Sequence, residues 1–218
     1  MTGGPTAATE PARECARCPR LVAFRNDNKR AHGDWFNGAV PSFGAGDARL
    51  LIVGLAPGLK GANRTGRPFT GDYAGELLYA TLAKFGFAAG SYEARPDDGL
   101  ALRGCMVTNA VRCVPPQNKP SGAEQSNCRP FLAARLGAME RLEAVLALGR
   151  IAHEAVLSAL GRRKSAHPFG HGRVHDLGQR FRLYDCYHCS RYNTNTGRLT
   201  AAMFEAVFSQ IRDRLRAP

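Results

Sequence analysis

The stretch "RLLIVGLAPGLKGANRTGRPFTGD", residues 49–72, decides the fold, because an uninterrupted apolar run passes directly into a segment rich in glycine and proline. An apolar run over 49–56 that ends at Pro57-Gly58 is typical of a strand buried on both faces of a parallel sheet. Such sheets bind ligands at the carboxyl ends of their strands. Residues 54–72 are therefore expected to hold a ligand: a nucleotide phosphate, a metal or a flipped nucleobase.

Strands and helices alternate along the rest of the chain. Further strands are predicted over 104–113, 143–149 and 179–188, and helices over 74–87, 123–139, 150–160 and 199–215. Residues 14–31 begin with a Cys-x-x-Cys motif and continue with a helical pattern. This alternation indicates an α/β fold, an α/β/α sandwich around a central four-stranded, mostly parallel sheet. No repeat or break in composition divides the chain. Residues 14–218 are predicted to form a single domain, and residues 1–13 a short flexible leader.

The composition limits the class of protein. Thirty Lys and Arg against eighteen Asp and Glu give a net charge of +12, which favours a polyanionic partner but also suits an unspecialised basic enzyme. No run approaches the ~18 apolar residues of a membrane helix, and the leader lacks the pattern of a signal peptide. Seven cysteines, an odd number, indicate thiols kept reduced. A cytoplasmic protein without membrane contact is expected.

A phosphate-binding P-loop does not fit the opening stretch. That loop needs a glycine directly before its lysine and Ser or Thr directly after it. Here Leu59 and Gly61 flank Lys60, and Pro57 lacks the N–H that a phosphate cradle uses. A nucleotide hydrolase of this type is therefore excluded.

The spacing of the cysteines indicates a second candidate site. A Cys-x-x-Cys motif near the N-terminus and a later pair, carried on a strand end and a helix, give four candidate ligands: Cys15, Cys18, Cys113 and Cys128. Four thiolates from distant segments can bind zinc or an iron–sulfur cluster, although four unrelated buried thiols would give the same count. Cys105 and Cys186 lie within apolar strands and are expected in the core, and the pattern does not decide the role of Cys189.

Three polar residues follow the predicted strands at one edge of the sheet. Asp72 ends the opening stretch, Asn109 ends the second strand, and His188 ends the fourth. Each has an alternative structural role: Asp72 as a helix cap, Asn109 as a partner for a strand end, and His188 as a hydrogen-bonded residue at the rim. Their convergence on one edge favours a shared cleft.

Two segments of the sequence resemble the signature motifs of a known protein family. Residues 54–72 together with "YHCSRYNTNTGRLT", residues 187–200, resemble the two signature segments of the family 5 (type b) uracil-DNA glycosylases. The four cysteines resemble those that bind a 4Fe–4S cluster in families 4 and 5, and the similarity extends from Cys15 to the last helix. The resemblance implies the same α/β/α fold and a DNA repair enzyme that flips uracil out of DNA and hydrolyses its N-glycosidic bond.

The resemblance also implies roles for individual residues. Asp72, Asn109 and His188 would be catalytic, with Asn109 reading the base edge and His188 donating to the leaving base. Phe69 would stack on the base, unless it is a core residue. The full base-binding set would be Gly54, Ala56, Pro57, Gly58, Phe69, Asn109 and His188. DNA would be contacted by Arg64, Arg67, Ser190, Arg191, Tyr192 and Asn193, with Arg191 or Tyr192 filling the gap left by the base.

Two departures from the wider superfamily affect these roles. Relatives carry a carboxylate beside the first-motif proline, where this chain has Leu55 and Ala56. The water-activating role would then fall to Asp72, and the small Ala56 side chain leaves room for hypoxanthine or xanthine. The second motif reads His-Cys-Ser in place of His-Pro-Ser, which makes Cys189 a substitution within the loop and not a catalytic thiol.

The sequence therefore predicts a monofunctional glycosylase that leaves an abasic site, acts on DNA containing uracil or other deaminated bases, and works as a monomer. No lysine in either motif is placed to act as a Schiff-base nucleophile. Two alternatives remain: a catalytically silent iron–sulfur DNA-binding damage sensor, which the apolar Leu55-Ala56 pair allows, and a zinc-stabilised RNA-processing enzyme.

Overall fold

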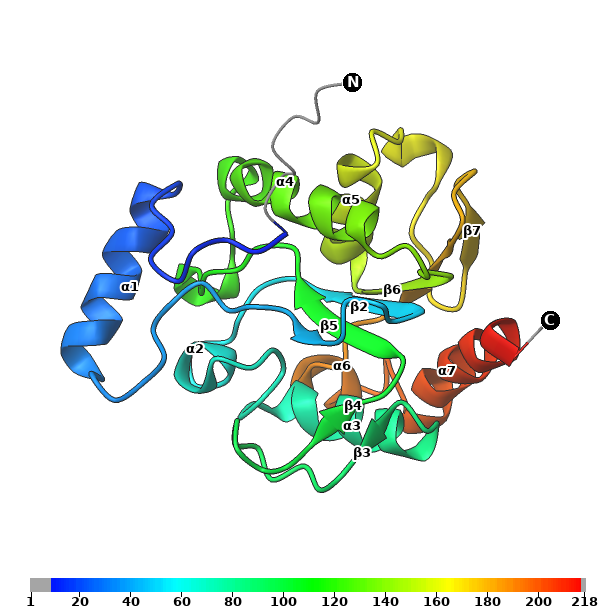
Figure 1. Ribbon diagram of the computed structural model, residues 1–218, viewed down its shortest axis with the longest axis horizontal. Helices are drawn as coiled ribbons and strands as arrows, with labels where there is room; N and C mark the ends of the chain where they lie inside the picture. Colours follow the sequence, from blue (N-terminus) through cyan, green and yellow to red (C-terminus); the bar gives the residue numbers. More distant parts are fainter. Residues whose placement is uncertain (1–8, 217–218) are drawn as a thin grey trace.

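The computed structural model describes residues 9–216, which surround a six-stranded sheet of order β1-β5-β2-β6-β8-β7 (Figure 1). Its strands are β1 (Phe43–Gly44), β5 (Cys105–Asn109), β2 (Leu50–Gly54), β6 (Ala144–Leu148), β8 (Arg182–Cys186) and β7 (Val174–Asp176). The four inner strands are parallel, and β1 and β7 pair antiparallel at the edges. The four predicted strands and their parallel arrangement are confirmed. The two short edge strands were not predicted.

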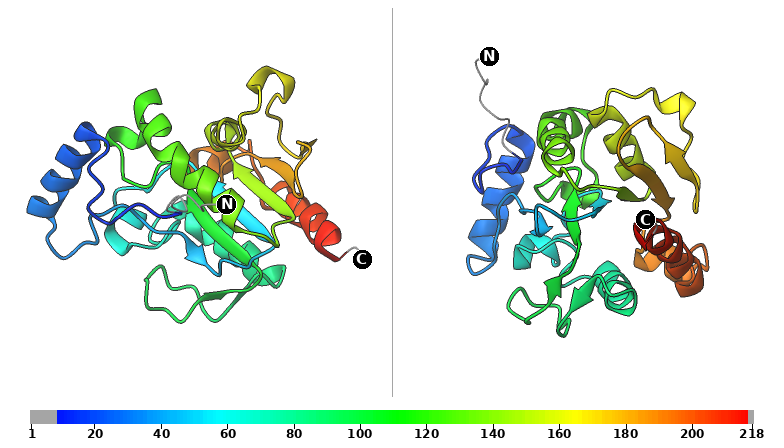
Figure 2. Two further views of the ribbon diagram at one scale, coloured as in Figure 1. Left: turned by 45° about the horizontal axis from the view of Figure 1, so that its top comes forward. Right: turned by 45° about the vertical axis from the view of Figure 1, so that its right-hand side comes forward.

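Helices cover both faces of the sheet, as the three views show (Figures 1 and 2). The helices are α1 (Pro19–Ala31), α2 (Ala62–Thr65), α3 (Tyr73–Lys84), α4 (Gly122–Ala138), α5 (Arg150–Ala159), α6 (Arg191–Asn195) and α7 (Ala201–Arg216). Two 3₁₀ turns, η1 (Pro116–Asn118) and η2 (Lys164–Ala166), and a hairpin of β3 (Ala88–Ala89) with β4 (Ala101–Leu102) complete the fold. No helix in the part of the chain described is long and apolar enough to cross a membrane.

The opening strand is apolar throughout because each of its faces meets a different layer of helices. Successive side chains of a strand point to opposite faces. Leu50 and Ile52 pack into the core formed with α3 and α7, and Leu51 and Val53 pack into the core formed with α4 and α5. All four are completely buried, so strand β2 lies at the centre of the sandwich and its carboxyl end is held rigidly.

Local sequence signals place the helices that follow these strands. Asp72 caps α3, and Ser121 with Glu124 forms a capping box at the start of α4. Helix α4 continues through Pro130. Helix α1 starts at Pro19, directly after the Cys-x-x-Cys motif, because proline suits the first turn of a helix.

The N-terminal boundary of the domain lies earlier than the sequence predicts. Glu10 forms ion pairs with Arg112 at 2.9 Å and Arg135 at 2.6 Å, and it accepts from the Ser42 backbone N–H at 3.1 Å. Arg112 is only 2% exposed, so these contacts are internal. Residues 9–13 therefore belong to the folded domain, which corrects part of the predicted 1–13 leader. The rest of that prediction, residues 1–8, lies outside the described residues.

Candidate active site

A cleft of about 570 Å³ lies where β2, β5 and β8 end. All three polar loops that the sequence placed at this edge contribute to it. Its walls are formed by Leu55, Ala56, Pro57, Gly58, Leu59, Lys60, Gly61, Phe69, Asp72, Tyr73, Ala74, Asn109, Asn118, His188, Ser190 and Arg191. The three loops therefore converge on one cleft, as expected.

Phe69 forms an aromatic wall of the cleft. It is 6% exposed, and its ring stacks on the His188 ring at a centroid distance of 5.8 Å and an interplanar angle of 27°. Its backbone φ is +53°, a left-handed conformation that costs of order 1–3 kcal/mol in a non-glycine residue. Gly54 allows this packing, because a Cβ there would lie 2.5 Å from Phe69 Cζ and 2.5 Å from Asn109 Oδ1. The end of β2 therefore has to be glycine.

Asn109, the last residue of β5, lines the cleft and has a side-chain oxygen that is buried without a partner among residues 9–216. The residue is 3% exposed, and its Oδ1 atom has no hydrogen-bond partner in the described part of the chain. A buried polar atom without a partner costs about 1–3 kcal/mol. A ligand that donates a hydrogen bond at this point would remove that cost.

Asp72 caps a helix and also lines the cleft. Its Oδ1 accepts from the Gly75 backbone N–H at 3.3 Å and so caps α3, while the residue also lines the cleft. A Cβ at Gly61 would lie 2.4 Å from Asp72 Oδ2, so glycine there makes room for the carboxylate. Burial raises the pKa of Asp72 above its usual value, which makes the carboxylate a stronger base.

His188 faces the cleft as a neutral imidazole. Burial lowers its pKa to about 4, so at neutral pH the ring carries one N–H donor and one acceptor nitrogen. Its backbone carbonyl accepts from Asn193 Nδ2 at 2.8 Å, and Ser190 Oγ accepts from the Asn193 N–H at 3.4 Å to cap α6. The loop after His188 is therefore held in place by the residues that follow it.

The sequence-predicted DNA contacts fall into two groups. Arg64, Arg191 and Tyr192 are exposed, and Tyr192 is 71% exposed beside the cleft. Ser190 lines the cleft wall, and both Ser190 and Asn193 make the hydrogen bonds that shape the loop.

Arg67 does not belong to this surface. It is 5% exposed, and its guanidinium binds both carboxylate oxygens of Asp98 at 2.8 and 2.7 Å. The rings of Phe43, Tyr79 and Tyr92 surround it at 5.2, 5.6 and 5.8 Å. This burial contradicts the prediction that Arg67 contacts DNA, because a phosphate cannot reach a charge that is already paired inside the protein.

The four candidate ligand cysteines lie around one small cavity between α1, α4 and the end of β5. Burial, with the neighbouring Cys128, raises the pKa of Cys113 to about 12. No three of the four sulfur atoms, all within the described residues, lie within 4.8 Å of one another. A tetrahedral zinc site needs sulfur atoms about 3.8 Å apart, from Zn–S bonds of about 2.3 Å. The four sulfur atoms are therefore not arranged as in a tetrahedral zinc site.

The other three cysteines are core residues. Cys105 and Cys186 are fully buried in β5 and β8, as predicted. Cys189 is also fully buried, and its Sγ donates to the Ala74 carbonyl at 3.4 Å. Burial raises the pKa of Cys189 to about 12, so the thiol is not an activated nucleophile.

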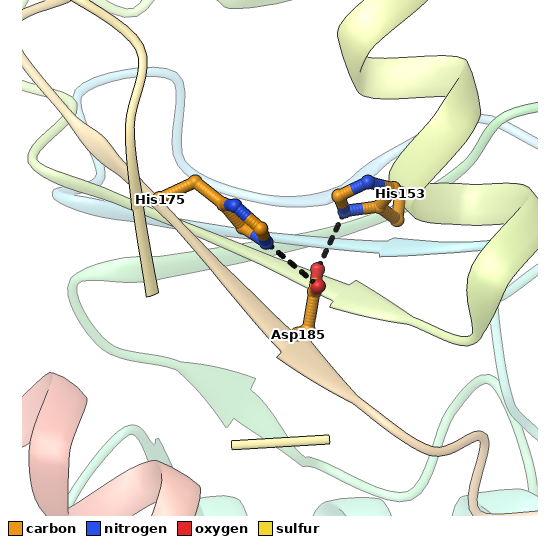
Figure 3. A group of neighbouring side chains, drawn as sticks. All are labelled: His153, His175 and Asp185. Atoms are coloured by element: carbon orange, nitrogen blue, oxygen red, sulfur yellow. Dashed lines mark hydrogen bonds and ion pairs between the residues drawn. The ribbon is translucent and has the colours of Figure 1, made fainter. Parts of the chain in front are cut away.

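A buried His-Asp-His group escaped the sequence analysis (Figure 3). Asp185 accepts from His153 Nδ1 at 2.7 Å and from His175 Nε2 at 2.9 Å, and its Oδ2 also accepts from the Gly170 N–H at 3.1 Å. His153 Nε2 lies 2.8 Å from the His167 carbonyl, so both nitrogens of His153 face oxygen atoms.

The ligand atoms of this group lie within 4.8 Å of one another, as in a metal site. Their N···O separations, however, are those of hydrogen bonds. The hydrogen bonds of both imidazole rings to Asp185 satisfy this group without a metal. No short motif links residues so far apart in the chain, so no sequence signal could have found the group.

Comparisons with known proteins decide the family. The model of the Uracil DNA glycosylase superfamily matches residues 41–212. The chain is 47% identical over 203 residues to the Type-5 uracil-DNA glycosylase of Thermus thermophilus, covering 91% of this chain and 92% of that one. The chain belongs to the type-5 uracil-DNA glycosylase family.

Other relatives support the same assignment. The Type-5 uracil-DNA glycosylase of Mycobacterium tuberculosis is 41% identical over 206 residues, with coverage of 91% of this chain and 77% of that one. A Type-4 uracil-DNA glycosylase of Pyrobaculum aerophilum is 32% identical over 155 residues, covering 71% and 65%. The type-5 family fits both the α/β/α sandwich and the cleft at the carboxyl edge of its sheet.

Proposed function

We propose that this type-5 family member excises uracil from DNA by hydrolysing the N-glycosidic bond, and that it leaves an abasic site. The single observation that carries the proposal is the buried, unpartnered Oδ1 of Asn109 in the wall of the cleft. This oxygen has no hydrogen-bond donor beside it in the described part of the chain, and the N3–H of uracil is a donor that can fill the position. Extruding a base from the duplex costs a few kcal/mol, and its contacts in the cleft offset that cost.

The chemistry follows from the three polar groups. The bond between the sugar carbon C1′ and the base nitrogen breaks, and its electron pair leaves with the base. His188, neutral at pH 7, donates a hydrogen bond to the base oxygen as negative charge develops there. Asp72 orients a water molecule whose oxygen bonds to C1′, and the carboxylate accepts the proton that the water loses.

Phe69 supplies the stacking surface for the base. An aromatic ring stacked on a base contributes roughly 1–3 kcal/mol in single-strand binding sites. The left-handed backbone of Phe69 and the glycine at position 54 together bring the ring into the cleft. The proposed base-binding pocket consists of Gly54, Ala56, Pro57, Gly58, Phe69, Asn109 and His188.

The proposed DNA surface consists of exposed groups around the cleft. Arg64 and Arg191 would contact phosphates, which dominate affinity in a protein of net charge +12. Arg191 lies over the Tyr73 ring at 5.2 Å, whereas Tyr192 is 71% exposed. Tyr192 is therefore proposed to fill the gap that the flipped base leaves in the duplex. The protein is proposed to act as a monomer in the cytoplasm.

We further propose that Cys15, Cys18, Cys113 and Cys128 hold a 4Fe–4S cluster. Their placement around one cavity supports this proposal. The buried Arg25 lies close enough to influence the Cys113 thiol electrostatically and would balance part of the negative charge of a thiolate-bound cluster. Bound there, the cluster would tie the N-terminal segment to β5 and α4.

The cluster proposal is tested by composition and colour. Protein purified without oxygen should be brown and contain close to four iron and four sulfide per chain. Cys→Ser at any of the four positions should lower the iron content, whereas Cys105→Ser, in the core of β5, should leave it unchanged. A colourless protein that contains zinc would contradict the proposal.

The glycosylase proposal is tested on oligonucleotides that each carry one uracil, hypoxanthine or xanthine. Abasic sites are revealed by alkaline cleavage. Uracil strands should be cut after incubation, and matched thymine strands should not. Protein that binds the uracil duplex without producing abasic sites would instead support the silent damage sensor.

A second activity, on deaminated purines, is proposed from Ala56. This residue lines the cleft with only a methyl group, which leaves space beside a bound base. Hypoxanthine or xanthine should then be excised, and Ala56→Phe should slow purine excision more than uracil excision. Purine strands left intact by a protein active on uracil would remove this second activity alone.

A further inference from the structure

Residues 90–100 contact the loop that carries Phe69 but do not line the cleft. The Tyr92 hydroxyl donates to the Phe69 carbonyl at 3.2 Å and accepts from the Gly71 backbone N–H at 3.3 Å. The Tyr92 ring stacks on Tyr79 at a centroid distance of 4.7 Å. One hydroxyl thus connects the backbone on both sides of Thr70, and the proposed reaction gives it no role.

An ion pair joins the same two segments a second time. Asp98 binds the Arg67 guanidinium through both oxygens, and it also accepts from the backbone N–H groups of Glu93 at 2.9 Å and Leu100 at 3.0 Å. Arg67 in turn donates from Nε to Thr70 Oγ1 at 2.7 Å. Arg67 holds the pKa of Asp98 well below its usual value, so this carboxylate stays ionised. Both ends of the Phe69 loop are therefore fixed to residues 90–100.

Phe69 needs such restraint because its own backbone preference opposes the observed conformation. A φ of +53° is unfavourable for a residue with a side chain, and surrounding contacts have to maintain it. A Cβ at Gly75 would lie 1.8 Å from the Phe69 carbonyl oxygen and 2.4 Å from the Tyr92 hydroxyl. The carbonyl is thus enclosed between the start of α3 and Tyr92.

We propose that Tyr92 and Asp98 are positioning residues for base excision, which hold the Phe69 ring where the flipped base stacks. Neither residue lines the cleft, so they act through Phe69 and not on the substrate. The inference rests on the proposed function, because it assigns Phe69 to the base. Small displacements of positioning groups slow enzymes strongly, since the reacting groups lose their alignment.

Tyr92→Phe tests the proposal, because it removes one oxygen and keeps the ring stacked on Tyr79. The single-turnover rate of uracil excision should fall roughly tenfold, well within the range that misplaced groups cause. Affinity for abasic DNA should stay within about threefold, because phosphate contacts dominate it. Tyr184→Phe is the matched control: Tyr184 is buried in β8, and its hydroxyl makes no hydrogen bond within residues 9–216. This control should keep the wild-type rate.

A double-mutant cycle separates positioning from general stability. Phe69→Ala removes the ring, so adding Tyr92→Phe should then change the rate less than twofold. Equal rate losses in both backgrounds would overturn the proposal, and so would a Tyr92→Phe variant with the wild-type rate. A Phe69→Ala variant with the wild-type rate would overturn the stacking role as well. A slow Phe69→Ala beside a normal Tyr92→Phe would remove only the positioning role.

Discussion

The cleft and the buried His-Asp-His group both contain aspartate and histidine side chains. The two regions differ in how many of their polar atoms already have hydrogen-bond partners. Asp185 has partners on both oxygens, and His153 has an oxygen atom against each nitrogen. In the cleft, Asp72 keeps the capping contacts of α3, and Asn109 Oδ1 has no partner within residues 9–216. Groups whose hydrogen-bonding capacity is filled hold the fold together. Groups whose capacity is left open are available to a ligand.

Among the substitutions that test this difference, Asp72→Asn should have the largest effect on the rate of uracil excision. The substitution removes the base that accepts a proton from water, and we expect uracil excision to slow by about 10²–10⁴-fold. Asparagine caps helices about as well as aspartate, so the melting temperature should change little. Single-turnover kinetics and thermal melts measure the two effects. Glu76→Gln, at an exposed acid one turn further along α3, is the control and should stay active.

Asn109→Ala should have the second-largest effect on the rate of uracil excision, and it should leave the stability of the protein unchanged. Loss of one such hydrogen-bonding group costs about 10²–10³-fold in rate, so excision should fall by that factor. The folded protein should not lose stability through that atom, because Asn109 Oδ1 has no partner to lose in the described part of the chain. A large drop in melting temperature would mean that the amide is structural after all. Retained binding to abasic DNA checks that the fold is intact.

Asp185→Asn should show the opposite combination. Breaking a buried ion pair costs about 3–5 kcal/mol, or roughly 6–20 °C in melting temperature for a domain of this size. The excision rate of the folded fraction should stay within about threefold. The control is Asp176→Asn, because Asp176 is an exposed aspartate on the neighbouring strand β7. A loss of rate without a loss of stability would place Asp185 in the reaction.

The dependence of the rate on pH should give the smallest effect. Burial raises the pKa of Asp72, and the reaction needs its carboxylate, so the rate should fall as the pH drops through that raised pKa. His188 stays neutral down to about pH 4, so its protonation should not affect the rate near neutrality. The expected slope is about tenfold per pH unit below the Asp72 pKa. Asp72→Asn should lose this acid limb, and a rate that rises toward pH 4 would show that an imidazolium is needed instead.

The sequence predicted the inner sheet and the cleft because each depends on local patterns. Continuous apolar runs identify strands buried on both faces, and the polar residues after them identify the carboxyl edge. The edge strands β1 and β7, with two and three residues, are too short to show any period. Their pairing is decided by neighbours that are distant in the chain.

Arg67 shows why composition misleads at individual positions. A basic residue in a glycine-rich loop of a basic protein resembles a phosphate contact, and only tertiary structure brings Asp98 and three aromatic rings to it. The His-Asp-His group escaped for the same reason. Ion pairs between segments far apart in the chain leave no spacing to read, whereas Asp72, Asn109 and His188 each follow a strand.

The Glu10 contacts have a practical consequence for protein engineering. Glu10 neutralises Arg112, which precedes Cys113, one of the four candidate ligand cysteines, and lines the same cavity. A shortened gene that starts at the Cys-x-x-Cys motif would leave this guanidinium buried without its counter-charge. Expression designs should therefore retain residues 9–13, and an affinity tag or fusion partner is better attached beyond α7 than in place of the first residues.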